Sequence, residues 1–178
     1  IEIIAAYLTP HISLLISPIG SLDGLIHLRQ GLCHVAGTHL LDASGEYNVP
    51  FVRRLFLDRA VTMFTLSHRI QGLIVAPGNP KGLKTPLDLI QSGVSLINRN
   101  PGSETRLWLD QELTRLGVPT TLIRGFENFV STHSAAAQAV QAGKADVAIG
   151  IQAAAWEAQL DFIPLFEERY DLVINTAQ

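Results

Sequence analysis

The chain has 178 residues, of which 47% are hydrophobic and 16% are charged. These fractions are typical of a globular protein with a substantial core and exclude a disordered chain. The net charge of −3 gives no sign of nucleic-acid contact by this segment, and no apolar run approaches the roughly 18 residues of a membrane-spanning helix. The single cysteine, Cys33, excludes an internal disulfide and favours a reducing compartment, so we expect a cytoplasmic protein.

Apolar strand patterns alternate with helical patterns along the chain. In the first part of the chain, we expect a helix or helix end at 1–8, a strand at 12–17, a helix at 20–30 and strands at 33–41, 61–66 and 72–76. In the middle, we expect a helix start at 85–88, a strand at 94–98, a helix at 104–116 and a strand at 121–124. In the last part, we expect a helix from 131–133 to about 143, a strand at 146–151, a helix at 152–159 and an extended segment at 162–165. Strands separated by helices predict parallel sheets covered on both faces, and therefore an α/β fold.

The spacing of the turns favours two lobes over a single sheet. Residues 77–82 form the densest Pro/Gly cluster, and the elements between residues 86 and 151 form a unit of their own. Pro164 then interrupts the last extended segment, which can carry the chain back. We therefore expect lobe I at 1–76 plus 164–178 and lobe II at 77–163, with a ligand cleft between them.

The strongest candidate site lies where the strand at 94–98 runs through a Gly-Ser turn into a helix. The first turn of a helix presents free N–H groups and the positive end of its dipole, which together attract anions. Four side chains add to this end: the hydroxyls of Ser103 and Thr105, and the guanidinium groups of Arg99 and Arg106. Alternatively, Ser103 only caps the helix and the arginines are solvated, with Arg106 paired to Glu104 or Asp110 along the helix.

Other residues are weaker candidates for the same cleft. Thr38 and His39 end a predicted strand, where doubly wound proteins place ligand groups. His133 lies in the first turn of a helix, and Tyr47 follows a Gly turn. Ser21 begins a helix whose N-terminus can face the cleft, although a Ser at a helix start is more often an ordinary cap.

A catalytic function is not indicated by the sequence. We find no nucleophile with a positioned base, no metal-ligand spacing and no phosphate loop with its lysine. We therefore expect no enzyme activity, no metal and no cofactor. An enzyme acting on a small anionic metabolite remains an alternative, in which groups such as His39, His133, Glu46 and Glu167 supply acid–base chemistry.

Several stretches together resemble a known family. They are Gly20–Leu25, Val35–Asp42, Gly45–Asn48, Gln71–Gly82, residues 98–106 and the tail at 161–173. In this combination they are similar to the cytoplasmic periplasmic-binding-protein-like domain often found behind helix-turn-helix DNA-binding domains in prokaryotes. The resemblance implies a two-lobed type II periplasmic-binding-protein-like fold, cut from a longer regulator whose first strand and following turn precede residue 1.

The resemblance is closest in character to the binders of molybdate and tungstate. It implies that Arg99, next to Asn98, is the cationic ligand and that Ser103 and Thr105 are hydroxyl donors. Glu104 replaces the glycine usual before Thr105-Arg106, and a carboxylate there repels a dianion unless it points away. The implied function is oxyanion sensing as the effector domain of a transcriptional regulator, with a fused or partner DNA-binding domain. A solute-binding component of an uptake system is the alternative, and an organic anion such as a pterin is an alternative ligand.

Overall fold

A computed structural model describes residues 12–17 and 19–176, so the helix expected at 1–8 lies outside the described residues. The strands are β1 (Val35–Thr38), β2 (Val61–Val75), β3 (Leu96–Arg99), β4 (Phe129–Val130), β5 (Val147–Ile151) and β6 (Asp161–Asn175). The helices are α2 (Ser21–Gln30), α3 (Val49–Leu55), α4 (Glu104–Arg115), α5 (His133–Gln141) and α6 (Gln152–Glu157), with short 3₁₀ turns η1 (Pro86–Ile90) and η2 (Thr120–Leu122). The predicted α/β class is confirmed.

The strands form one sheet in the order β1-β6-β2-β5-β3-β4. The prediction of parallel sheets is wrong for most of it, because β6 pairs antiparallel with β1 and β2, and β2 pairs antiparallel with β5. Only β3 runs parallel to its neighbours β4 and β5.

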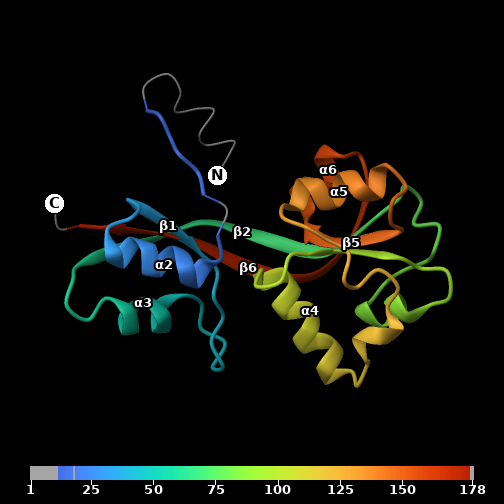
Figure 1. Cartoon of the computed structure of the whole chain (residues 1–178), viewed down its shortest axis with the longest axis horizontal. Helices are drawn as coiled ribbons and strands as arrows, with labels where there is room; N and C mark the ends of the chain where they lie inside the picture. The colour runs from blue at the N-terminus through green and yellow to red at the C-terminus, as the bar shows by residue number, and fades with distance from the viewer. Residues whose placement is uncertain (1–11, 18, 177–178) are drawn as a thin grey trace.

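Strands β2 and β6 are each 15 residues long and run through both halves of the molecule (Figure 1). The predicted breaks at residues 67–71 and at Pro164 are therefore wrong. Pro164 is accommodated because the register shifts between Gln71 and Gly72, directly opposite it. A Cβ on Gly72 would lie 2.1 Å from the carbonyl oxygen of Ile163, so only glycine permits this close approach of the two backbones.

Three hydrophobic clusters hold the elements together. One packs α4 and η1 on one face of the sheet around Leu73, Leu109 and Phe126, and a second packs α5 and α6 on the opposite face around Ile74 and Ala148. Helices thus cover both faces in this half, as predicted. The third cluster joins α2 and α3 to β1 and the C-terminal half of β6.

Several local predictions differ from the structure. Residues 12–17 form no strand, and Leu15 there is fully exposed. The strand predicted at 121–124 is absent, and η2 occupies its first half; beside β3, the carbonyls of Arg124 and Asn128 accept single hydrogen bonds from Leu96 and Asn98. The helix α3, which has Pro50 in its first turn, was not expected. No helix among the described residues has the length and apolarity to cross a membrane.

Candidate functional site

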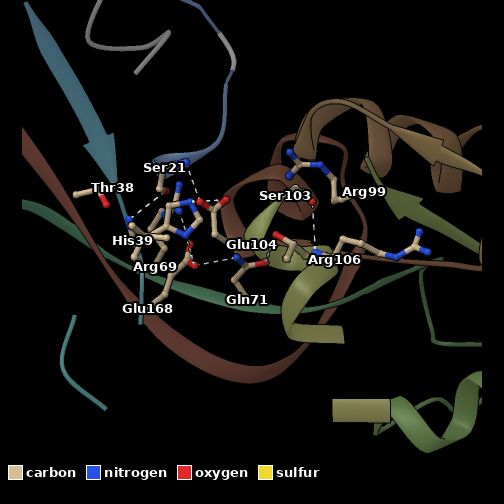
Figure 2. Close-up of polar contacts among 12 residues, drawn as sticks. Ser21, Thr38, His39, Arg69, Gln71, Arg99, Ser103, Glu104, Arg106 and Glu168 are labelled. Carbon is tan, nitrogen blue, oxygen red and sulfur yellow. Dashed lines mark hydrogen bonds and ion pairs between the residues drawn. The ribbon is translucent and has the colours of Figure 1, made fainter. Parts of the chain in front are cut away.

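Polar side chains gather where β2 and β6 pass between the N-termini of α2, α4 and α5. We call this group the polar cluster; it consists of His39, Arg69, Gln71, Arg99, Glu104, His133 and Glu168 (Figure 2). The two strands supply Arg69, Gln71 and Glu168, and the starts of α4 and α5 supply Glu104 and His133. His39 follows β1, and Arg99 ends β3.

Glu168 is the most enclosed charge of the polar cluster, with 3% of its surface exposed. It forms an ion pair with Arg69, accepts a hydrogen bond of 2.9 Å from Gln71 Nε2 and lies 3.1 Å from His39 Nδ1. Burial alone raises its pKa, but the hydrogen bond and charge of His39, together with Arg69, outweigh burial and lower the pKa to about 2. Glu168 is therefore an ionised anchor for the groups around it.

Glu104 joins two helix N-termini. It is the first residue of α4, yet its Oε1 accepts a 2.8 Å hydrogen bond from the backbone N–H of Ser21, the first residue of α2. Its Oε2 lies 3.4 Å from His39 Nε2. Burial raises the pKa of Glu104, but His39 and the Ser21 hydrogen bond outweigh it, and the net pKa is lowered. The carboxylate thus lies where a helix attracts an anion and does not point into solvent.

Three basic side chains of the polar cluster have buried nitrogen atoms with neither a hydrogen-bond partner nor an ion pair in the described part of the chain. They are Nε of Arg69, Nε of Arg99 and Nδ1 of His133, which donates in one of its neutral tautomers. Burial lowers the pKa of His133 well below its ordinary value, and the charges of Arg99 and Arg69 lower it further. Burial also lowers the pKa of Arg99, against the opposing charge of Glu104. Because buried polar groups are normally paired, these unpaired nitrogen atoms indicate a place for an acceptor from outside the described residues.

Among the predicted site residues, five lie in or directly beside the polar cluster. Arg99 and His133 belong to it, as does His39. The Thr105 hydroxyl donates to Gln71 Oε1 at 3.1 Å, and the Ser21 hydroxyl accepts from the His39 N–H at 3.3 Å. The structure thus brings five of the residues predicted from the sequence together between the helix N-termini.

The remaining predicted residues have hydrogen-bond or ion-pair partners within the chain. Asn98 donates to the Phe126 carbonyl, Thr38 donates to Asn48 Oδ1, and the Tyr47 hydroxyl donates to the Glu167 carbonyl. Arg106 contacts Asp110 at 3.3 Å and lies over the Phe126 ring, so the alternative in which it pairs along the helix is confirmed.

Ser103 caps α4, with its hydroxyl oxygen accepting from the Arg106 N–H at 3.3 Å. We expect Ser103→Ala to lower the free energy of unfolding by about 1 kcal/mol, because a helix N–H loses its acceptor. Urea unfolding measures this change. An unchanged midpoint would show that the cap contributes nothing here, and Ser134→Ala in the first turn of α5, where Thr132 is the cap, is the matched control.

Sequence reasoning missed Arg69, Gln71 and Glu168. The polar residues at 67–71 were interpreted as a break between two strands, although they form the middle of β2. Gln71 and Glu168 fall within two of the stretches that carry the family resemblance, 71–82 and 161–173, whereas Arg69 lies outside all of them. In the described residues, no group of three or more His, Cys, Asp or Glu side chains is placed to hold a metal ion.

Comparisons with known proteins agree with this architecture. The sequence matches the PBP superfamily domain over residues 5–178. The uncharacterized protein YvgK of Bacillus subtilis (strain 168) is 41% identical over 156 residues, which are 87% of this chain and 51% of that protein. The chain therefore spans about half the length of this relative.

Two solved structures share the fold at low sequence identity. The CcmR regulatory domain of Synechocystis PCC6803 in complex with 2-PG has a TM-score of 0.66 and 12% identity, covering 99% of this chain and 81% of that one. A putative phosphate ABC transporter substrate-binding protein with bound phosphate, from Clostridium perfringens, has a TM-score of 0.64 and 13% identity, covering 98% and 81%. The chain has a type II periplasmic-binding-protein-like fold, and it belongs to the PBP superfamily domain family.

Proposed function

We propose that this chain binds a small oxyanion at the polar cluster, with molybdate or tungstate as the favoured ligand, and that it does so without catalysis. The observation that carries the proposal is the set of buried nitrogen atoms on Arg69, Arg99 and His133 that lack acceptors. An oxyanion supplies several acceptor oxygens at once, and its charge is stabilised by two guanidinium groups.

The charges of the polar cluster favour a local anion site. Glu168 is compensated by Arg69, and Glu104 is held by Ser21 and His39. The Arg99 side chain has only the Ser131 carbonyl as a hydrogen-bond acceptor among the described residues, at 2.9 Å from its Nη2. The starts of α4 and α5 add the positive ends of two helix dipoles beside it. Of the two structural neighbours named above, the one from Clostridium perfringens holds bound phosphate, which supports the same ligand class.

We propose that the anion couples two lobes, residues 1–76 plus 164–178 and residues 77–163. The separation of the hydrophobic clusters supports this division, since the cluster of α2, α3 and β1 shares no residue with the two clusters around β5. A ligand that prefers a closed arrangement shifts the population toward it, which suits the effector domain of a transcriptional regulator with a DNA-binding partner. The phosphate-binding neighbour, whose TM-score is nearly as high, favours a solute-binding component of an uptake system as the second candidate.

Thermal unfolding with a panel of anions tests the proposal. Molybdate, tungstate, phosphate, sulfate and small carboxylates are each added to this chain, with chloride at matched ionic strength as the control. A ligand at about a hundred times its dissociation constant adds about 2.7 kcal/mol, or a rise of roughly 5–10 °C at this size. A rise with molybdate or tungstate and not with sulfate supports the favoured ligand. No rise with any oxyanion contradicts the proposal.

Glu104→Gln is expected to tighten oxyanion binding by about tenfold. The amide oxygen still accepts from the Ser21 N–H, whereas the negative charge beside the anion is removed, and such repulsion is worth at least about 1 kcal/mol at a partly buried site. Calorimetric titration with molybdate, or with whichever oxyanion the thermal panel selects, measures the change.

Glu112→Gln is the matched control, because Glu112 lies on the same helix and pairs with Arg115 away from the polar cluster. Equal affinity of Glu104→Gln and wild type would place the anion away from Glu104.

A further inference from the structure

A pocket of about 270 Å³ opens beside the polar cluster, between α4 and β6. One wall is a single face of α4, because its four lining residues are spaced as i, i+3, i+4 and i+7: Glu104, Leu107, Trp108 and Gln111. The opposite wall consists of residues 166–168 of β6, residues 39–41 after β1, and Tyr47. The pocket thus shares His39, Glu104 and Glu168 with the polar cluster but extends away from Arg99.

The side of the pocket away from the cluster is aromatic. Trp108 stacks on Phe166 with ring centroids 4.3 Å apart and planes inclined by 26°. Both rings are only partly buried, and Leu41 and Leu107 beside them are about half exposed. A partly exposed aromatic pair within a concave site offers a flat apolar surface to a ring or a short hydrocarbon.

Acidic side chains line the pocket, two at its inner end and one at its rim. Three of its lining residues are acids, Glu104, Glu167 and Glu168, and none is a lysine or arginine. The pKa of Glu104 and that of Glu168 are both lowered, with His39 as the main opposing influence to their burial, so both are ionised at neutral pH. Glu167 is 63% exposed at the rim, where its Oε1 lies 2.8 Å from His68 Nδ1.

We propose that this pocket is a second ligand subsite, which takes a small organic ammonium group attached to a ring. The ring lies on Trp108, and the ammonium is directed at the exposed carboxylate of Glu167, because Glu104 and Glu168 are already paired with Ser21, His39 and Arg69. The charge of the lining matches a cation and not a second anion, and the aromatic pair adds cation–π attraction and apolar contact. This subsite goes beyond the proposed oxyanion site.

Tryptophan fluorescence tests this subsite without any oxyanion. The chain has two tryptophans, and Trp156 is 66% exposed on α6, so the variant Trp156→Phe leaves the emission of Trp108 alone. Benzylammonium is titrated into this variant in parallel with benzyl alcohol and benzoate, which have a similar ring without the positive charge. We expect a saturable change in Trp108 emission with benzylammonium. Benzyl alcohol and benzoate are expected to bind about tenfold or more weakly than benzylammonium. Equal binding of all three probes, or no saturable response to benzylammonium, overturns the proposal.

Glu167→Gln provides the second arm, because the Glu167 side chain is 63% exposed and its substitution is expected to leave the fold intact. In the Trp156→Phe background, it is expected to weaken benzylammonium binding by about three- to fivefold, as for an exposed ion pair. Glu157→Gln on α6, an exposed acid outside the pocket, is the matched control and is expected to leave binding unchanged. Unchanged binding in Glu167→Gln contradicts the proposed orientation. Since the oxyanion is absent throughout, failure here and failure of the anion panel are separate results.

Discussion

Arg99→Ala is expected to weaken oxyanion binding by at least about tenfold without unfolding the chain. The guanidinium of Arg99 is largely buried, and its Nε has no acceptor among the described residues. The attraction between two unit charges about 4 Å apart at a protein surface is about 4 kcal/mol, so the loss can reach about a thousandfold. Calorimetric titration with molybdate, or with the oxyanion that the thermal panel selects, measures the affinity.

The control for this variant is Arg124→Ala, which removes the same charge at an exposed position on the loop after η2. Its affinity is expected to stay within about twofold of wild type, because exposed charges are screened by salt. Far-ultraviolet circular dichroism of both variants checks the fold. If Arg99→Ala is folded and binds like Arg124→Ala, Arg99 is not an anion ligand.

Acid is expected to destabilise the chain through Glu168. Its folded pKa of about 2 lies below the ordinary value of 4.5, so its contribution to stability is fully present above about pH 4.5. The contribution is lost as the pH falls from about 4.5 toward 2, and a shift of this size corresponds to about 3 kcal/mol. Urea unfolding of the wild type at pH 7 and pH 3 measures the loss.

Glu168→Gln separates this residue from the other acids of the chain. At pH 7, it is expected to reduce the free energy of unfolding by about 3–5 kcal/mol, because Arg69 and His39 lose their buried counter-charge. Its further loss between pH 7 and pH 3 is expected to be smaller than that of the wild type. Glu157→Gln is the control and keeps the wild-type pH dependence. An equal pH dependence in Glu168→Gln and wild type would contradict the assigned role.

The sequence predicts the local elements better than the way in which they pair. Capping residues and hydrophobic spacing placed α2, α4 and α5 within a few residues of their observed ends. The antiparallel β2–β6 pair was not predictable in the same way, because polar residues at 67–71 and Pro164 look like interruptions. The pairing of β2 with β6 places Gly72 opposite Pro164 at a register shift, and this is visible only once the two strands are paired.

The residues of the site also divide into those with a local sequence signal and those whose partners are distant in the sequence. The signals at Arg99, Ser103, Thr105 and His133 are local, since each belongs to a strand end or a helix start. Glu168 was predictable only as part of the family resemblance, since its partners Arg69 and Gln71 lie 97 or more residues away. The conformation of Glu104 also required the structure, because the sequence does not indicate that its carboxylate turns to the N-terminus of α2.

Diffraction from crystals of this chain soaked in tungstate tests the central claim most directly, because the metal is located by its anomalous scattering. The account predicts a peak beside Arg99 and His133, with oxyanion oxygens about 2.7–3.2 Å from Arg99 Nε and Arg69 Nε. An ordered tungstate elsewhere on the chain, with none at the polar cluster, would contradict the account.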